Sequence, residues 1–355
     1  MSRVLPRLFA ATVLSASLWL AACQKKEDTP ASAPPAPAKA EPPKPVTIEV
    51  VPENERSKSF LAVTRQLELG GTLYGYADID GDAAKLAGNI QSLLAQLAKT
   101  QPALAKAARQ DYAVLANKLG LTDVKAVGLS SVPDGTGFFR NRVFFYTPEE
   151  RHGLLAGLGG KPGPFTLLPL APADTMFYTE ADLDLAVVYQ TIGDVVKDVA
   201  GEKARTDLDA GLRKAGESAK LALLDLIYGL KGHAAVVLRV DSTKTMRLPG
   251  AKPFTLPQFS VLACVENIGP IVEKSLASSG ALQRSDEGNV HVYTLAQPSP
   301  IAEWTPTFAV EGGTLYFATS RAFLDECRAG KTTLAGEATF QKALAHVGPE
   351  GNGLT

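Results

Sequence analysis

The strongest constraint on the fold of this chain is an order of segments that occurs twice. Residues 73–80 (LYGYADID) resemble residues 176–184 (MFYTEADLD), with one residue inserted. Each segment predicts a strand that ends in Asp-x-Asp and leads into an amphipathic helix. Such self-similarity is typical of a chain built from two related structural units.

Patterns around these two segments predict the remaining elements. Apolar residues at helical spacing predict helices, glycine-rich turns predict hairpins, and residues 147–150 (TPEE) have the capping-box pattern of a helix start. In the first unit we expect helices over 60–67, 86–97, 104–119 and 147–160, and a hairpin of strands over 124–132 and 138–146. In the second unit we expect helices over 188–199, 204–230 and 319–330, a strand over 233–240 and a hairpin over 308–317.

Together these elements predict an α+β fold in which antiparallel sheets are packed by long amphipathic helices. We interpret it as two diverged copies of a strand–helix–helix–hairpin–helix unit, the first over residues 46–165 and the second over residues 166–355. Chance similarity between ordinary αβ segments is the alternative. With 45% hydrophobic and 21% charged residues, the chain has the composition of a globular protein with a sizeable core.

Residues 1–22 have the pattern of a secretory signal peptide. Arg3 and Arg7 give a positive start, residues 8–20 are apolar, and small residues follow. An apolar helix of that length would rise about 20 Å, short of the ~30 Å hydrocarbon core of a bilayer. We therefore interpret the segment as a cleaved signal rather than as a membrane span.

The end of this segment, Leu20-Ala21-Ala22-Cys23, resembles the lipobox of a bacterial lipoprotein signal. The resemblance implies that Cys23 carries acyl chains such as palmitate, which anchor the protein in the bacterial cell envelope. In the sorting rule of such lipoproteins, an aspartate after the cysteine retains the protein in the inner membrane. Gln24 stands at that position, which implies the outer membrane, with the protein facing the periplasm or the surface.

Residues 23–45 predict a lipidated cysteine followed by an extended tether. Seven prolines lie between Gln24 and Pro45, among alanine, lysine, glutamate and serine. A segment with so few large apolar residues cannot bury enough surface to offset its ordering entropy, and its prolines favour polyproline II. At ~3.1 Å per residue, the tether would lift the folded part up to about 60–70 Å from the membrane.

The C-terminal end of the sequence predicts a helix over 340–347, a turn over 348–353 and the start of a strand at Leu354 and Thr355. Because the strand that would bury Leu354 is missing, we expect a fragment or truncated product whose residues 306–347 are poorly packed. A frayed natural terminus is the alternative.

Two short segments carry a resemblance to a known family. Residues 171–178 (APADTMFY) enter a strand and residues 334–344 (LAGEATFQKAL) lie on a helix. Both resemble a domain of unknown function found in secreted or membrane-anchored bacterial proteins with a proline-rich stalk. The resemblance would cover about residues 60–355, and it implies no known chemistry and no functional residue.

Catalytic motifs are missing from the sequence. No HExxH, CxxC, GxSxG or GxxxxGK[ST] pattern occurs. The histidines do not pair at metal-ligand spacing; they are His152, His233, His291 and His346. We therefore expect no cofactor and no catalytic residue, and we expect a structural role for His233 at the start of an apolar strand.

Asp78, Asp80 and Asp82 are weak candidates for a metal site. Three carboxylates beside Gly81 supply the oxygen ligands that calcium prefers. However, Asn89 stands where an EF-hand loop has its bidentate glutamate. We interpret the carboxylates instead as capping groups that favour the positive end of a helix dipole, and we expect no bound metal.

Two further features concern burial. Aromatic residues are concentrated on one predicted strand: Phe138, Phe139, Phe144, Phe145 and Tyr146. We expect this strand to be buried on both faces; an exposed binding surface or lipid groove is the alternative. We also expect Cys264 and Cys327 to be buried thiols, although an oxidising envelope would allow a disulfide.

The leading functional hypothesis is a non-enzymatic, membrane-anchored envelope lipoprotein with a structural role or a role in interaction and assembly. Its partners would be the membrane, through the lipid on Cys23, and another envelope protein. A net charge of −1, without a basic tract beyond Lys25 and Lys26, argues against nucleic acid. The alternatives are a carrier of a hydrophobic ligand such as a lipid, and an envelope enzyme with dispersed catalytic residues.

Overall fold

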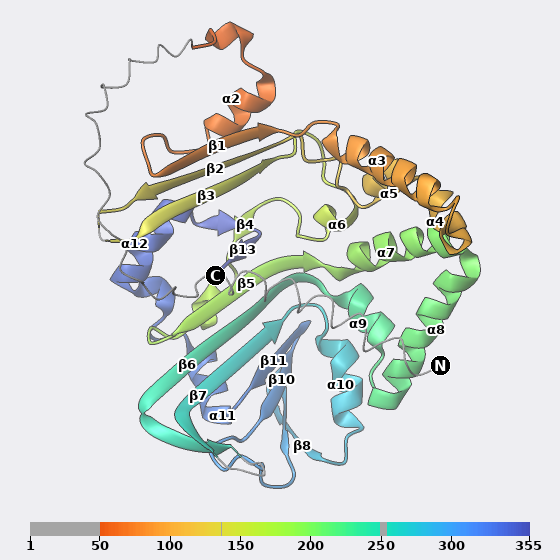
Figure 1. Cartoon of the computed structure of the whole chain (residues 1–355). Coiled ribbons are helices and arrows are strands. Elements are labelled where there is room, and N and C mark those ends of the chain that lie inside the picture. The colour runs from red at the N-terminus through yellow and green to blue at the C-terminus, as the bar shows by residue number, and fades with distance from the viewer. Residues whose placement is uncertain (1–49, 136, 249–253) are drawn as a thin grey trace, which may run out of the picture. The chain divides into compact units, whose positions relative to one another are not determined.

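The computed structural model of the chain describes residues 50–135, 137–248 and 254–355 (Figure 1). The predicted signal peptide, Cys23 and the tether lie outside the described residues. Asn54–Thr355 cluster as one unit by their contacts.

The first part of this unit contains a three-stranded antiparallel sheet in the order β1-β2-β3. The strands are β1 (Leu73–Asp78), β2 (Ala126–Pro133) and β3 (Phe139–Tyr146). Helix α2 (Lys58–Thr64) packs on one face of the sheet (Figure 1). Val63, Leu67 and Ala126 are the buried centre of this small core, because α2 presents its apolar side to the sheet.

Four helical segments connect β1 to β2: α3 (Asp82–Leu97), the 3₁₀ turn η2 (Pro102–Leu104), α4 (Ala105–Ala108) and α5 (Tyr112–Lys118). The single helix predicted over 104–119 is therefore wrong. Asp111 accepts hydrogen bonds from the backbone N–H groups of Ala113 and Val114, at 3.1 and 3.0 Å. This carboxylate caps a new helix and so divides the predicted one.

The helix start predicted at residues 147–150 is also wrong. A single turn, α6 (Gly153–Ala156), forms only after His152. The backbone N–H of His152 donates to Asp123 at 2.8 Å, and Arg151 donates to the carbonyls of Gly159 and Gly160 at 2.7 Å each. These tertiary contacts hold the segment in a non-helical conformation and override the local capping signal.

The second part is built on an eight-stranded antiparallel sheet in the order β13-β5-β6-β7-β11-β10-β9-β8. The long strands at its centre are β5 (Phe177–Asp184), β6 (Lys231–Leu248) and β7 (Phe254–Val265). The remaining strands are β8 (Leu282–Glu287), β9 (Val290–Leu295), β10 (Thr307–Glu311), β11 (Thr314–Ala318) and β13 (Gly353–Leu354). A separate two-stranded pair joins β4 (Gly163–Pro164) to β12 (Glu350–Gly351).

Helices α7 (Leu185–Ala200), α8 (Glu202–Ala219) and α9 (Leu223–Gly229) connect β5 to β6. The long helix predicted over 204–230 is wrong, because Lys220 adopts a left-handed conformation with φ 53° and ends α8. The sequence patterns also missed several elements between 254 and 295. The other helical segments are α10 (Gly269–Ala277), α11 (Arg321–Ala329), α12 (Ala338–Val347), η3 (Leu168–Leu170) and η4 (Leu334–Gly336).

One face of the large sheet carries the main core. Helix α11 covers this face together with η3, and its Phe323, Leu324 and Cys327 are at most 1% exposed. The opposing sheet residues include Val237, Leu262, Cys264, Val292, Ala309 and Ala318. Both cysteines are therefore buried thiols as predicted, and they are free. The expectation of poor packing over 306–347 is wrong for β10, β11 and α11, which supply part of this core.

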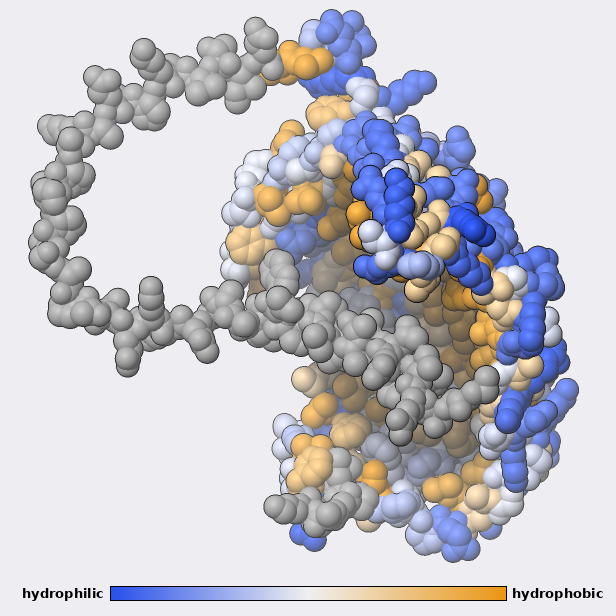
Figure 2. Space-filling view, turned by 45° about the vertical axis from the view of Figure 1, so that its right-hand side comes forward, coloured by the Kyte–Doolittle hydropathy of each residue, from blue (hydrophilic) through white to orange (hydrophobic). Residues whose placement is uncertain are grey.

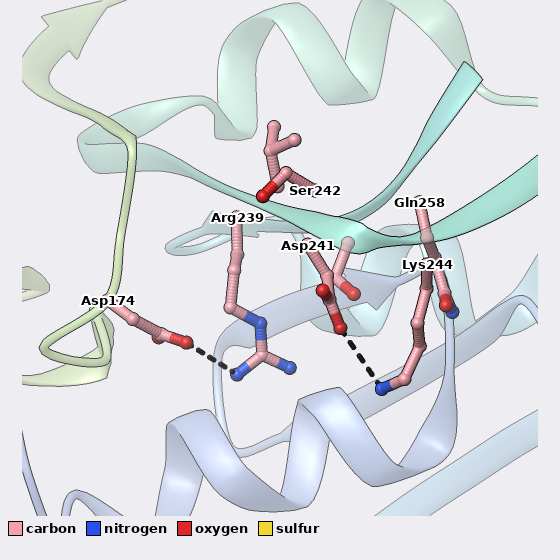
Figure 3. Close-up of a pocket in the computed structure, with 8 residues that line it drawn as sticks. Asp174, Arg239, Asp241, Ser242, Lys244 and Gln258 are labelled. Carbon is pink, nitrogen blue, oxygen red and sulfur yellow. Dashed lines mark ion pairs between the residues drawn. The ribbon is translucent and has the colours of Figure 1, made fainter.

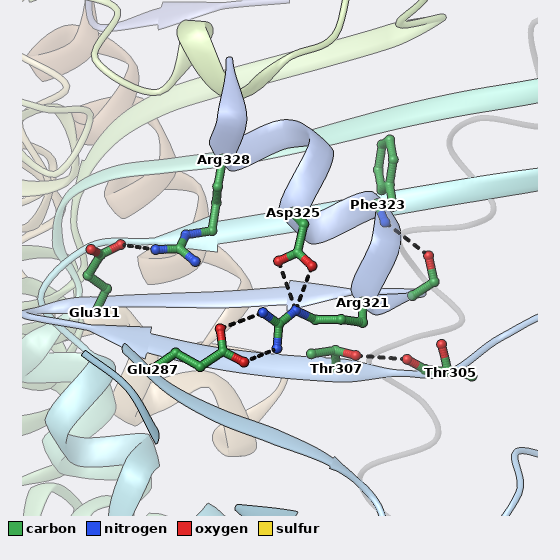
Figure 4. Close-up of polar contacts among 9 residues, drawn as sticks. Glu287, Thr305, Thr307, Glu311, Arg321, Phe323, Asp325 and Arg328 are labelled. Carbon is green, nitrogen blue, oxygen red and sulfur yellow. Dashed lines mark hydrogen bonds and ion pairs between the residues drawn. The ribbon is translucent and has the colours of Figure 1, made fainter. Parts of the chain in front are cut away.

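Ion pairs fasten α11 to neighbouring strands (Figure 4). The Arg321 guanidinium donates to both carboxylate oxygens of Glu287, at 2.8 and 2.6 Å, and to Asp325 at 2.8 Å. Arg328 donates to Glu311 at 2.8 Å. The hydrogen bond from Arg321 lowers the pKa of Glu287 below its usual value. The pairs fix the helix over the core, and being partly exposed they add orientation more than stability.

The two parts of the unit use the same local topology. In each, one strand leads into a helix that spans 16 residues, α3 or α7, and the chain returns to add a hairpin beside that strand. The spatial orders are β1-β2-β3 and β5-β6-β7. The Gly-Gly hairpin predicted over 308–317 is confirmed as β10–β11, but the hairpin that pairs with β5 is β6–β7.

We predict that Gly128→Ala destabilises the protein by about 1–3 kcal/mol, the usual cost of overpacking. A Cβ on Gly128 would stand 2.2 Å from Val63 Cγ1 and 2.8 Å from Leu67 Cδ1, and would push α2 off the sheet. The control is Gly211→Ala in α8, where no atom lies within 4 Å of the added Cβ. Urea unfolding should show no loss for the control; equal stability of both variants would contradict the packing of α2.

Candidate functional site

The outer face of the three-stranded sheet is apolar and open. Phe139, Val143 and Phe145 alternate along β3 and are 50, 62 and 59% exposed. Across the sheet, Val143 is paired with Leu129 and Phe145 with Val127, so apolar residues of neighbouring strands share this face. The prediction that this strand is buried on both faces is therefore wrong. The opposite face, with Phe144 and Tyr146, packs against the small core under α2.

Helix α3 adds a second open apolar surface. It packs against α5, and its Ala87 is buried. An adjacent stripe at helical spacing is 38–61% exposed; its members are Leu86, Ile90, Leu93 and Leu97. The sequence pattern located this stripe but predicted it as a packed face.

The large sheet also has an uncovered apolar area, on the face opposite α11. Helix α10 covers this face only over β8–β11, where Leu276, Tyr293 and Val310 are buried. Over β5 and β6, Phe177 and Val236 are 44 and 37% exposed. The register places further apolar residues on the same side: Ala181, Leu238, Val261 and Ala263.

We call these three areas the open apolar faces: the outer face of β1–β3, the α3 stripe, and the uncovered side of β5–β7. Figure 2 shows a hollow in the molecular surface whose visible inner wall is coloured hydrophobic, while the outer surface around it is mostly hydrophilic. Contiguous exposed apolar patches on soluble proteins often mark binding sites.

A smaller apolar groove of about 490 Å³ lies between α12 and β5. Its lining includes Phe165, Met176, Leu344, Val347 and Leu354. Met176 and Val347 are 74 and 69% exposed, so the groove is open to solvent. It adds a fourth place where an apolar group could bind.

A buried polar cluster joins β5 to β6 and η3. The Glu180 carboxylate is 1% exposed and accepts hydrogen bonds from the Tyr178 hydroxyl and, at 3.3 Å, from the Leu167 backbone N–H. His233 Nδ1 lies 2.7 Å from Glu180 Oε1, but the angles at these atoms do not allow a hydrogen bond. Burial, reinforced by this carboxylate, raises the pKa of Tyr178 above its usual range. Because Glu180 does not reach solvent, we interpret the cluster as structural; the structural role of His233 stays a prediction.

The aspartates singled out as metal candidates each have a local partner. Asp78 accepts from the Asp80 backbone N–H and the Tyr76 hydroxyl, both at 3.1 Å. Asp80 pairs with Lys125 at 2.9 Å, and Asp82 pairs with Lys85 at 2.9 Å. No group of three or more metal-ligating side chains occurs in the ranges that the structure describes.

The capping interpretation holds only in part. The N-cap of α3 is Gly81, with φ 78° and no side-chain cap, so none of the three aspartates caps this helix. Asp82 does lie in its first turn, where a carboxylate favours the helix dipole. In the second part, Asp184 caps α7 by accepting from the Val187 N–H at 3.1 Å.

Two further histidines lie beside carboxylates. His152 Nδ1 lies 2.6 Å from Asp123, and His291 Nδ1 contacts Glu273. Burial raises the pKa of the Cys264 thiol to about 12, which makes it a poor nucleophile.

Comparison of the chain with protein-family models, with curated proteins and with solved structures finds no match. Within the described ranges, no helix combines the length and apolar character that crossing a bilayer requires. The open apolar faces are therefore the principal guide to function.

We predict opposite outcomes for two adjacent phenylalanines of β3. Phe144→Ala removes a side chain packed on the small core and should cost about 3 kcal/mol or more. Phe145→Ala removes a side chain that is 59% exposed and should cost less than about 1 kcal/mol. Chemical denaturation measures both. A comparable loss for Phe145→Ala would mean that the outer face is covered rather than open.

Proposed function

We propose that this protein is a non-enzymatic envelope lipoprotein that binds a hydrophobic ligand, such as a lipid acyl chain, on its open apolar faces. The observation that carries the proposal is the outer face of β1–β3, where Phe139, Val143 and Phe145 stand exposed. Covering apolar surface releases about 25 cal/mol per Å², so any apolar ligand that fits these faces gains affinity.

The chemistry of the faces favours an acyl chain over a protein as the ligand. The uncovered sides of both sheets are lined mainly by aliphatic and aromatic groups, and Asn141 and Ser131 form the main polar pair on the outer face of β1–β3. A hydrocarbon chain has no polar group to satisfy, so it loses no hydrogen bond when it binds such a surface. The role in envelope assembly, through a protein partner, remains the second candidate.

We further propose that the chain arose by duplication of a strand–helix–hairpin unit. Two features support this: β1-β2-β3 and β5-β6-β7 have the same spatial order, and α3 and α7 both span 16 residues after an Asp-x-Asp. Both units leave one sheet side uncovered, so a duplicated scaffold would offer two related apolar surfaces.

The proposed anchor completes this assignment. Acyl chains on Cys23 would hold the protein at the envelope membrane, and the proline-rich tether over 24–45 would let the folded part move toward and away from the lipid surface. By the sorting resemblance of Gln24, this membrane would be the outer one, and no nucleic acid or cofactor is involved.

We predict that native mass spectrometry of the full chain, isolated from cells in mild detergent, shows an added mass that disappears on denaturation. Covalent acyl chains would persist on denaturation, so the two species are distinguishable. Phe145→Asp should abolish the added mass by placing a charge on the outer face of β1–β3. Leu69→Asp, at a position that is 77% exposed in the loop after α2, is the matched control and should retain it.

An unchanged added mass in Phe145→Asp would exclude the outer face as the binding site. If the added mass in the native spectrum is that of a protein subunit rather than that of a small molecule, the assembly role is favoured. No added mass from any preparation would overturn the carrier proposal.

We also predict that Cys23→Ser yields an unprocessed or soluble protein, because the thiol is the proposed acylation site. Membrane fractionation and intact-mass measurement test this. Correct cleavage with retained membrane association in the variant would show that the lipobox assignment is wrong, whatever ligand the folded part binds.

A further inference from the structure

A polar cavity of about 470 Å³ lies on the side of the large sheet opposite the uncovered apolar area of β5–β7 (Figure 3). It is formed where the pairing of β6 with β7 shifts register between Asp241 and Thr245, so that residues 242–244 bulge out of the strand. Its volume lies in the range of small-molecule sites.

The charged groups of this cavity neutralise one another. Arg239 lies 2.7 Å from Glu326 and 3.5 Å from Asp174, and Lys244 lies 3.0 Å from Asp241. The Arg239 guanidinium is also held 4.6 Å above the Phe323 ring, which fixes its position. An anionic ligand would have to displace these carboxylates, and a cationic ligand would have to displace these basic groups.

Asp241 is held in its charged form. Its carboxylate accepts from the Thr243 backbone N–H at 3.0 Å and from the Thr243 hydroxyl at 2.5 Å. The hydroxyl of Thr243, followed by Lys244, lowers the pKa of Asp241 to about 2. Asp241 therefore carries its negative charge at any physiological pH.

Uncharged polar groups that also line the cavity are left for a ligand. The side chains of Ser242, Gln258 and Ser260 line the cavity and form no hydrogen bond with the rest of the described chain. Gln258 and Ser260 are half-buried, and Ser242 is exposed. An amide and two hydroxyls offer both donors and acceptors to a neutral ligand.

We propose that this cavity binds a neutral polyhydroxylated ligand, with hydroxyl groups that bond Gln258, Ser242 and Ser260 beside the two pairs of charges. A sugar of one or two rings matches this chemistry. The proposal goes beyond the carrier function and does not depend on it, because the site shares no residue with the open apolar faces.

The test is saturation-transfer NMR of the full chain with three neutral disaccharides: maltose, cellobiose and N,N′-diacetylchitobiose. We expect transfer to at least one of them, and no displacement by inorganic phosphate. Gln258→Ala combined with Ser260→Ala should weaken binding at least tenfold. Gln283→Ala, an exposed glutamine of β8, is the matched control and should bind as the parent does.

A second variant guards against misfolding. Ser242→Trp fills the cavity from the exposed bulge without touching the core, and it should abolish the transfer while the unfolding midpoint stays unchanged. The proposal is overturned if none of the three sugars receives saturation at about 20 mM, a concentration that would reveal even millimolar affinity. Displacement by phosphate, or full binding by Ser242→Trp, would also overturn it.

Discussion

The pairing of β6 with its two neighbours is the interaction on which the second part of the molecule depends. β6 is bonded along β5 from one side and along β7 from the other, and its Val237 is 1% exposed at the centre of the core. Three consecutive segments of chain, with their connecting helices, are thereby fixed in one layer. The position of α11, of the polar cavity and of the open side over β5–β7 all follow from this layer.

Each sheet is covered by helices on one side and left largely apolar on part of the other. Water-exposed apolar area on this scale forgoes stabilisation that a second helical layer would provide. The small core under α2, built around Val63 and Leu67, shows that the chain can close a sheet face well. The uncovered faces are the surfaces on which the proposed hydrophobic ligand would bind.

Local sequence patterns predicted the elements whose signals are local. In three places the alternation of side chains and the turn residues specify the local structure. These are the strand at 73–78, the hairpin over 126–146 and the Gly-Gly hairpin over 307–318. The helix expected to start at residues 147–150 does not form, because Asp123, which is distant in sequence, accepts a hydrogen bond from the backbone N–H of His152. Helical spacing located the stripe on α3, yet spacing alone cannot tell a packed face from an open one.

The candidate site was less predictable than the fold for the same reason. The sequence shows which residues of β3 share a face. Because aromatic residues fall on both faces, it indicated a strand that is buried on both. Only the placement of α2 decides which side is covered. The sequence could not predict the polar cavity. The cavity depends on a register shift between β6 and β7 and on Asp174, which a different segment of the chain contributes.

The two thiols carry one more consequence. Cys264 and Cys327 lie in the same core, each 1% exposed, and burial raises the pKa of both to about 12. The core around them is therefore held by packing, without a disulfide between these two residues. A buried, protonated thiol is a poor target for oxidants, so each is protected as long as the fold around it stays closed.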